Sequence, residues 1–187
     1  MIREWRLISS RMDGDYGIFK VRTHRAVSPR TEREGEFYTL DCGSWVNVVP
    51  ITQAGNVVMI RQFRHGTRSI SFEIPGGLVE ETDPKDAAVR ELAEETGFEG
   101  ERVSLLGSVS PNPALFDNRC YTYLVENARK TRAPALDANE DIEVEEVPLM
   151  RIPALIAEGT IDHALVIAAF HFYFQRHGIL APLDAAL

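Results

Sequence analysis

The stretch 73-EIPGGLVEETDPKDAAVRELAEETGF-98 holds the residues around which the rest of the chain is organised. Its composition predicts, in order, the end of a strand, a glycine turn, a helix and a glycine stop. Gly76 and Gly77 are expected to serve the turn through backbone angles that other residues resist. Asp83 predicts the N-cap of the helix, with a proline at the first helical position, and Gly97 predicts its end.

The predicted helix has an apolar side and an acidic side. On a 3.6-residue wheel the apolar side holds Ala88, Val89, Leu92 and Ala93. Glu91, Glu94 and Glu95 fall on the other side, within one turn of each other. Three carboxylates so close together repel one another, and a hard divalent cation with oxygen ligands would relieve that repulsion. From the helix alone, a solvated acidic face is the simpler interpretation.

The residues around these carboxylates resemble a family motif. The run from Arg90 to Phe98, RELAEETGF, resembles the second half of the Nudix box, GX5EX7REUXEEXGU, in which U is aliphatic or aromatic. Every fixed position of that half is matched. Gly76 stands at the first glycine of the box, or Gly77 does if the turn is one residue shorter. Thr82 stands where the box has its first glutamate, and the resemblance to Nudix hydrolases extends over residues 45–174.

The resemblance implies an α/β fold, a Nudix-type α/β/α sandwich with a mixed sheet and the helix of the box against one face. Residues 16–21 and 37–40 have strand-like patterns, which predict a small N-terminal β unit. We expect residues 1–41 to form this unit and residues 42–187 to form the Nudix hydrolase domain. The N-terminal unit is too small to be stable alone. It must therefore pack on the main domain or on a second subunit, and the resemblance favours a homodimer.

Composition excludes several classes of protein. The 187 residues are 44% hydrophobic, which is enough for a core, and the net charge of −8 argues against a nucleic-acid or anionic-membrane partner. Two cysteines do not make a disulfide framework. The N-terminus lacks an apolar core of signal-peptide length, and the longest apolar stretch, around residues 164–174, is too short to span a bilayer. We therefore expect a cytoplasmic protein.

Two segments, 44–51 and 56–62, predict a β-hairpin whose second strand runs into the sequence RQFR. Arg61 and Arg64 of this sequence could belong to an exposed basic loop, but arginine also binds phosphate with a planar fork of donors. The segment resembles the RQ-aromatic-R stretch of the ADP-ribose branch of the family, which implies a substrate role for Arg61 or Arg64. Glu73, just before the glycine turn, is expected to support the same substrate site.

Further substrate contacts are expected from an aromatic residue and a proline-rich loop. Trp45 could be a core residue or could stack on a base. The loop 110-SPNP-113 could be a structural turn. It is also similar to the loop that ADP-sugar hydrolases place over the substrate, which implies a contact from Pro113.

The segment 136-LDANEDIEVEEV-147 predicts a polar loop followed by a strand. Its EDIEV pattern resembles the catalytic loop of the ADP-ribose branch, which supplies a glutamate facing the metal site. Glu140 is the best match, and Asp141 is the next candidate. Two helices are expected to close the chain, the second over residues 163–177 with Asp162 as its cap.

These residues together indicate a reaction. The resemblance implies that Glu91, Glu94 and Glu95, with Gly76, hold Mg²⁺ or Mn²⁺ and that Glu91 also serves catalysis. Such ions would neutralise a pyrophosphate and lower the pKa of a bound water, which a loop carboxylate such as Glu140 would orient or deprotonate. The expected reaction is hydrolysis of nucleoside diphosphate sugars similar to ADP-ribose, giving a nucleoside monophosphate and a sugar phosphate.

Two alternatives stay open. One is a house-cleaning hydrolase that acts on nucleoside triphosphates or dinucleoside polyphosphates. The other is a Nudix domain that senses a nucleotide without hydrolysing it. The intact R-E-x-x-E-E pattern over residues 90–95 favours hydrolysis over sensing.

Overall fold

The computed structural model describes residues 1–80 and 83–179. The chain forms two compact units. The first comprises Met1–Ser44 together with Ser110–Arg119, and the second comprises Trp45–Val109 and the chain from Cys120 onward. The first unit thus reaches past residue 41, where the sequence placed the domain boundary, and it also takes in the proline-rich loop.

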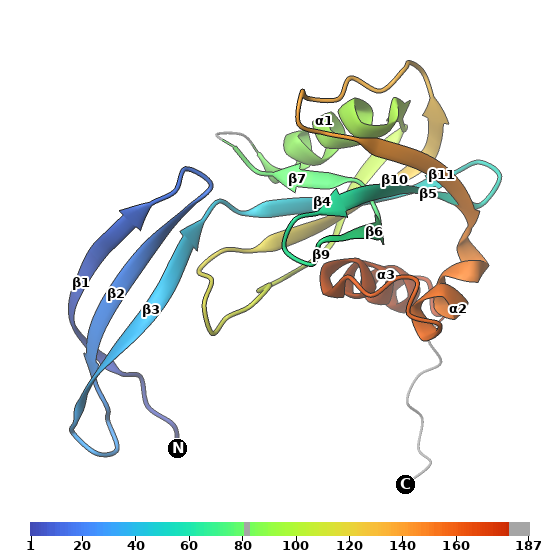
Figure 1. The fold of residues 1–187 in the computed structure, drawn as a ribbon. Coiled ribbons are helices and arrows are strands. Elements are labelled where there is room, and N and C mark those ends of the chain that lie inside the picture. The colour runs from blue at the N-terminus through green and yellow to red at the C-terminus, as the bar shows by residue number, and fades with distance from the viewer. Residues whose placement is uncertain (81–82, 180–187) are drawn as a thin grey trace, which may run out of the picture. The chain divides into compact units, whose positions relative to one another are not determined.

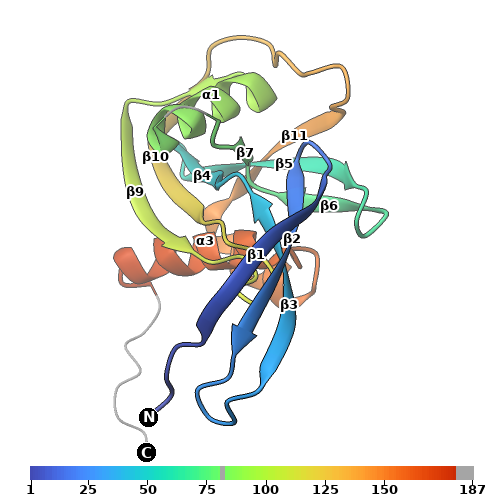
Figure 2. The same ribbon diagram turned by 90° about the vertical axis from the view of Figure 1, so that its left-hand side faces the viewer.

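The first unit is a three-stranded antiparallel sheet in the order β1-β2-β3 (Figure 2). Its strands are β1 (Arg6–Asp15), β2 (Phe19–Val27) and β3 (Glu34–Cys42). The pairing of β2 with β3, for example Val21 with Leu40, confirms the expected N-terminal β unit. The backbone N–H of Leu40 donates to the carbonyl of Leu115 at 2.7 Å, which attaches the proline-rich loop to β3.

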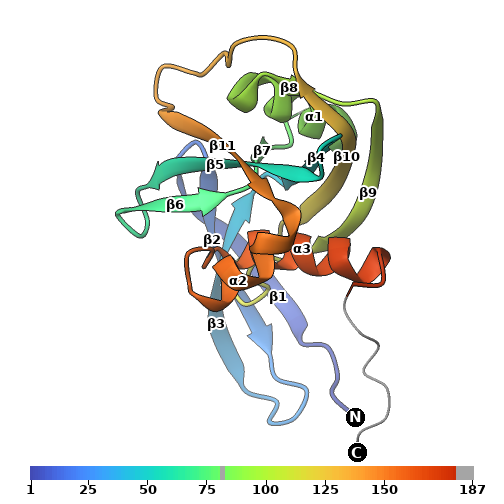
Figure 3. The ribbon, with the colours of Figure 1, turned by 90° about the vertical axis from the view of Figure 1, so that its right-hand side faces the viewer.

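The second unit is built on a mixed sheet of eight strands (Figure 3). The strands are β4 (Trp45–Thr52), β5 (Asn56–Arg64), β6 (Ser69–Glu73), β7 (Gly76–Leu78), β8 (Phe98–Glu99), β9 (Arg102–Val109), β10 (Cys120–Lys130) and β11 (Ile142–Pro148). Strands β4 and β10 run parallel, whereas the other strand pairs described in this sheet are antiparallel. This arrangement confirms the mixed sheet that the resemblance implied.

Helices cover both faces of this sheet, with α1 on one side and α3 on the other (Figure 1). The helices are α1 (Pro84–Thr96), the 3₁₀ turn η1 (Leu149–Arg151), α2 (Ile152–Ala157) and α3 (Ala164–Arg176). Each face has its own apolar core. On the α1 side the core includes Val46, Val58, Leu92 and Phe98, and on the α3 side it includes Met59, Phe72, Ile152 and Phe170. The second unit is therefore an α/β/α sandwich, as expected.

The segment β6–β7 separates the two strands of the predicted hairpin. Strands β4 and β5 pair beside their turn, at Ile51 and Val57. Further along, β6 pairs with β5 and β7 pairs with β4, and the Val48 N–H donates to the Pro75 carbonyl at 2.8 Å. The glycine turn therefore enters the middle of the sheet, between two strands, and passes beneath α1.

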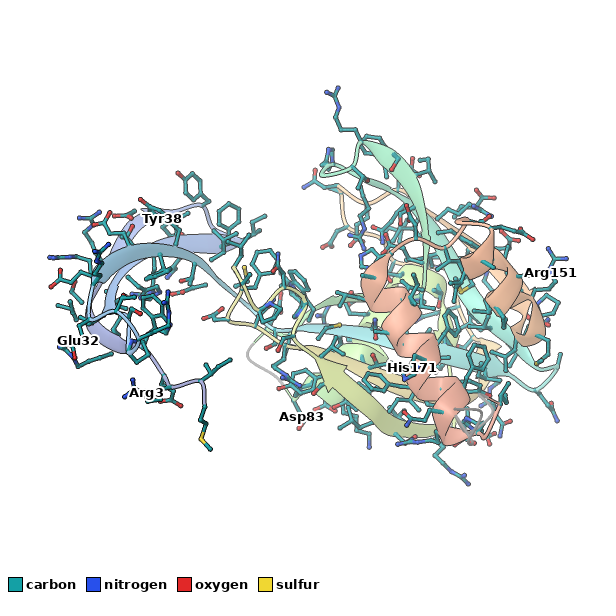
Figure 4. The ribbon with its side chains drawn as sticks, turned by 90° about the horizontal axis from the view of Figure 1, so that it is seen from below. Arg3, Glu32, Tyr38, Asp83, Arg151 and His171 are labelled. Atoms are coloured by element: carbon teal, nitrogen blue, oxygen red, sulfur yellow. The ribbon has the colours of Figure 1, made fainter. Side chains whose placement is uncertain are left out.

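Helix α3 starts one residue later than predicted. Its N-cap is His163, whose Nδ1 accepts a hydrogen bond from the Leu165 N–H at 3.2 Å, so the prediction that Asp162 caps the helix was wrong. An imidazole nitrogen can supply the acceptor that aspartate usually supplies. His171 lies on the exposed side of the same helix (Figure 4). Among the described residues, no helix is long and apolar enough to cross a membrane.

Candidate active site

Helix α1 is capped as its sequence predicts. The Asp83 carboxylate accepts a hydrogen bond from the Lys85 N–H at 2.8 Å. Gly97 ends the helix in the left-handed conformation, with φ of 74°, and donates to the Ala93 carbonyl. The apolar side differs at one position, because Val89 is 40% exposed whereas Ala87 is buried. The buried side of the helix is therefore rotated from the predicted one, away from Val89.

The acidic side of α1 is not a solvated face. Glu91 and Glu95 are 8% and 3% exposed, and Glu94 is half-buried. The Gly76 N–H donates to Glu95 Oε2 at 2.9 Å. The structure thus turns this side of the helix toward the glycine turn, and the simpler interpretation of a solvent-facing charge cluster is wrong for Glu91 and Glu95.

Gly76 and Gly77 are required by close packing. Neither has a positive φ, so the backbone explanation drawn from the sequence was wrong. A Cβ on Gly76 would lie 2.3 Å from the Val46 carbonyl oxygen, and a Cβ on Gly77 would lie 2.3 Å from Glu91 Oε1. The absence of side chains at the turn is therefore what lets the carboxylates of α1 approach the sheet.

These carboxylates line a pocket of about 280 Å³ in the second unit. The residues that line it are Gln62, Arg64, Gly76, Gly77, Leu78, Glu80, Arg90, Glu91, Glu94, Glu95, Ala135, Asp137 and Glu140. The structure thus brings together the predicted metal-binding residues, the best catalytic candidate Glu140 and one of the two predicted arginines. Acidic residues outnumber the arginines, so the pocket carries excess negative charge.

Glu140 is held in the pocket by its own loop. Its Oε2 accepts the Asp137 N–H at 2.9 Å, and its N–H donates to the Asp137 carbonyl at 3.0 Å. Asp141, the second catalytic candidate, is not among the residues that line the pocket. Asp137 does line it and was missed, although its position in the same acidic loop was a usable signal. Gln62 was also missed, and its signal was the alternation that puts it on the same face of β5 as Arg64.

Burial and mutual repulsion change the acidity of the carboxylates. The pKa of Glu95 is raised to about 8, and burial is the largest cause. The charges of Glu91 and Glu140 act in the same direction, whereas the Gly76 N–H and Arg64 act against it. Burial also raises the pKa of Glu91, against the effect of Arg90. A carboxylate that is so hard to ionise in the free protein would be stabilised strongly by a cation.

Arg90, itself a residue of α1, pairs with two carboxylates of the same helix. Its Nη2 is 2.8 Å from Glu91 Oε1 and its Nη1 is 2.7 Å from Glu94 Oε2. Because Thr82 stands at the position of the box glutamate, Arg90 needs another partner, and helical spacing predicts Asp86, four residues before it. The described side-chain partners, Glu91 and Glu94, instead follow Arg90 in the helix, and Arg90 Nη2 also donates to the Leu78 carbonyl at 3.4 Å. Thr82 itself, where the box glutamate is missing, lies outside the described residues.

The donor set of the pocket fits a divalent metal ion, although the side chains are not arranged around one. Among the described residues, no group of three or more His, Cys, Asp or Glu side chains already forms a metal-binding arrangement. Two of the carboxylates of α1 are bonded to Arg90 instead, and Glu95 is bonded to Gly76. All the donors are oxygens and their charge is only partly neutralised, which is the chemistry that hard cations prefer. Release of Arg90 would free Glu91 and Glu94 for such an ion.

The two arginines of β5 point to opposite faces of the sheet. Arg64 lines the pocket. The guanidinium of Arg61 lies 3.9 Å from the centre of the Phe72 ring, which belongs to the core on the α3 side, and its Nη2 is 3.1 Å from Glu145 Oε2. The alternation of side chains along a strand explains this separation. The structure therefore brings Arg64, and not Arg61, into the candidate site.

Glu73 lies beside the pocket and is bonded to Arg64. Arg64 Nε donates to Glu73 Oε1 at 2.8 Å, and Arg64 Nη2 donates to Glu73 Oε2 at 2.6 Å. Glu73 is 3% exposed. Burial alone would raise the pKa of Glu73, but the hydrogen bonds and charge of Arg64 leave that pKa below its ordinary value. The substrate role expected of Glu73 stays a prediction.

Two predicted substrate contacts lie outside the pocket lining. Trp45 begins β4, where it pairs with Leu78 of β7, and its side chain is half-buried. Pro113 belongs to the first unit with the rest of the proline-rich loop. Their roles in base stacking and substrate contact stay predictions.

The fold and the pocket define a class: an α/β/α sandwich whose buried helical carboxylates face a glycine turn. The model of the NUDIX domain matches residues 44–170, and the chain belongs to this family. The resemblance found in the sequence is thus confirmed. The family generally uses divalent metal ions.

Several curated proteins are similar over most of their length. A methanol dehydrogenase activator of Bacillus methanolicus is 34% identical over 70% of this chain and 72% of its own. An ADP-ribose pyrophosphatase of Bacillus subtilis is 32% identical over 73% of this chain and 75% of its own. An ADP-sugar pyrophosphatase of Mus musculus is 33% identical over 82% of this chain and 73% of its own.

A solved structure described as an ADP compounds hydrolase has the same fold. Its TM-score is 0.82, and the match covers 95% of this chain and 98% of that one. The sequence identity is 18%, so this likeness concerns the fold alone.

Proposed function

We propose that this chain hydrolyses the pyrophosphate bond of nucleoside diphosphate sugars similar to ADP-ribose, with Mg²⁺ or Mn²⁺ as cofactor. The products would be a nucleoside monophosphate and a sugar phosphate. The observation that carries the proposal is the pocket in which the carboxylates of α1, the loop residue Glu140 and Arg64 converge. The names of two similar proteins, an ADP-ribose pyrophosphatase and an ADP-sugar pyrophosphatase, support this choice of substrate.

Glu91, Glu94 and Glu95 would hold the metal, with a contribution from the backbone of Gly76. A bound divalent ion supplies positive charge against the pyrophosphate and lowers the pKa of a coordinated water. The role of the protein is to keep the carboxylates concentrated and partly buried, so that their repulsion favours ion binding. Arg90 pairs with Glu91 and Glu94 in this structure. When a metal ion is bound, Arg90 would neutralise the charge of a carboxylate that does not coordinate the ion.

Glu140 would orient the attacking water and accept its proton. The hydrogen bond from the Asp137 N–H leaves the second oxygen of the Glu140 carboxylate available for this task. Asp141 and Asp137 are the alternative bases in the same loop. Arg64 would bind a phosphate through the donors that Glu73 does not use, which would hold the pyrophosphate in line for attack.

The test is a panel of substrates incubated with the purified chain and Mg²⁺. ADP-ribose and GDP-mannose represent the proposed class, ATP and a diadenosine polyphosphate represent the house-cleaning alternative, and product analysis identifies the bond that is cleaved. We expect fastest turnover of a nucleoside diphosphate sugar and none in excess chelator. Faster turnover of ATP or of the dinucleotide would favour house-cleaning, and nucleotide binding without turnover would favour sensing.

The assembly and location of the protein belong to the same proposal. We expect a cytoplasmic homodimer with the sheet of the first unit at the interface. This sheet and its flanks expose large apolar side chains in the single chain, including Trp5, Leu7, Ile18 and Tyr38. A free protein rarely leaves so many apolar groups in water. Light scattering that shows a monomer at micromolar concentration would contradict this expectation.

A further inference from the structure

Both oxygens of the Glu73 carboxylate are already hydrogen-bonded within the protein. Both of its oxygens accept hydrogen bonds from Arg64, at 2.8 Å and 2.6 Å, and only 3% of the residue is exposed. Ser71, the neighbour of Glu73 on the same face of β6, helps to lower the pKa of this carboxyl group. A residue in this condition has little capacity left for direct contact with a substrate. Its effect on the pocket must pass through Arg64.

The pairing leaves Arg64 with unused donors. A guanidinium has five N–H groups, and the two bonds to Glu73 use the one on Nε and one on Nη2. The two N–H groups of Nη1 and the second one of Nη2 remain. Because Arg64 lines the pocket and Glu73 does not, these remaining donors belong to the part of the guanidinium that the pocket can use. The paired edge fixes the plane of the group, which would otherwise rotate on a long flexible stem.

Arg64 also has a competing partner within range. It lies close enough to Glu95 for each to stabilise the charge of the other. Without Glu73, the carboxylate of Glu95 would attract the guanidinium. An arginine bound to Glu95 would withdraw its donors from a phosphate and would occupy a carboxylate that the proposed function assigns to the metal.

We propose that Glu73 is a positioning residue that holds Arg64 in a phosphate-binding orientation and keeps it away from the carboxylates of α1. This inference rests on the proposed function, because it assumes that Arg64 binds a phosphate of the substrate. It explains how Glu73 would support the substrate site, as the sequence suggested, without contacting the substrate itself. The bidentate geometry predicts that a carboxylate of the correct reach is needed at residue 73, and not a polar group alone.

A double-mutant cycle tests this role. We expect Glu73→Gln to raise KM for the preferred nucleoside diphosphate sugar about tenfold, which corresponds to about 1.4 kcal/mol, with a smaller change in kcat at saturating Mg²⁺. In an Arg64→Met background the same Glu73→Gln change should leave KM within about twofold of the Arg64→Met value, since its only route of action is gone. Glu73→Asp, which keeps the charge but shortens the reach, should fall between wild type and Glu73→Gln.

The chain offers a matched control on the same strand. Arg61 and Glu145 form an ion pair at 3.1 Å on the opposite face of β5, outside the pocket. Glu145→Gln removes the partner of that arginine and should leave KM unchanged. A comparable rise of KM in Glu145→Gln would mean that any loss of an ion pair from β5 disturbs the site, and the specific role of Glu73 would be rejected.

The outcomes separate this inference from the proposed function. A wild-type protein that hydrolyses no pyrophosphate compound would overturn both. An active wild type in which Glu73→Gln raises KM equally with and without Arg64 would overturn the positioning role alone. If Glu73→Gln does not fold, as judged by circular dichroism, the cycle is run with Glu73→Asp, for which an equal effect in both backgrounds is again the contrary result.

Discussion

Helices α1 and α3 have the same length, 13 residues, and cover opposite faces of one sheet (Figure 1). The buried residues of α3 are Val166, Ala169, Phe170, Tyr173 and Phe174. The buried residues of α1 are Ala87, Ala88, Glu91, Leu92, Ala93, Glu95 and Thr96. One helix thus buries mainly large apolar and aromatic groups, whereas the other buries Leu92, several small residues and two carboxylates.

The difference shows what the fold requires and what it tolerates. Helix α3 demonstrates that a layer of this sandwich can be filled without buried charge. Carboxylates without a full set of partners are unfavourable in a protein interior, and the pKa of Glu95, raised to about 8, reports that penalty. We infer that Glu91 and Glu95 reduce the stability of the metal-free protein and are present for chemistry, whereas α3 provides stability.

The largest effect is expected from the loss of an apolar side chain of α3. Phe170 is fully buried in the core on the α3 side. Phe170→Ala should lower the free energy of unfolding by about 3–5 kcal/mol, because it removes a large side chain and leaves a cavity. Urea unfolding measures the change. The kcat of the protein that remains folded should stay close to wild type, and a selective loss of activity would contradict the division of roles between the helices.

The next effect is a dependence of stability on pH that arises from Glu95 of α1. The folded-state pKa of Glu95 is about 8, above its ordinary value of 4.5. Its protonated form therefore stabilises the fold at low pH, and this contribution is lost as pH rises through that interval, by up to about 1.4 kcal/mol per pH unit. Thermal unfolding of chelator-treated protein should show Tm falling toward pH 8, with a smaller slope in Glu95→Gln. Equal slopes would contradict the assignment to Glu95.

The loss of a metal ligand should have the next largest effect. Glu95→Gln is expected to lower kcat on the order of 100-fold, about 2.7 kcal/mol, because the metal that stabilises transition-state charge is misplaced. The fold should be retained, since the variant removes a buried charge. Steady-state kinetics at saturating Mg²⁺ measure the loss, and circular dichroism checks the fold. Near-normal kcat in Glu95→Gln would count against a metal site on α1.

The smallest effect is expected at the loop that faces α1. Glu140→Gln should lower kcat about tenfold or more while KM changes little, because a base acts mainly in the transition state. Asp141→Asn is the matched control, since Asp141 does not line the pocket. The two variants are compared at saturating Mg²⁺ over a range of pH. If Asp141→Asn abolishes turnover and Glu140→Gln does not, the wrong carboxylate has been chosen.

Local patterns of the sequence predicted much of the site. The caps of α1, Asp83 and Gly97, depend on hydrogen bonds within a few residues, so the sequence alone was enough to predict them. The clustering of Glu91, Glu94 and Glu95 follows from helical spacing. The resemblance to the family supplied Glu140, which local pattern alone could not have connected with a helix more than forty residues earlier in the chain.

The sequence by itself determined the α1 helix, its row of carboxylates and the family, because these depend on spacing along the chain. Only the tertiary structure decided which groups meet across elements. It placed Arg64 in the pocket and Arg61 on the opposite face of the sheet. It also paired Arg90 with Glu91 and Glu94. It also gave the reason for the glycines at 76 and 77, because a steric limit set by the Val46 carbonyl and the Glu91 carboxylate exists only after β7 has entered the sheet beneath α1.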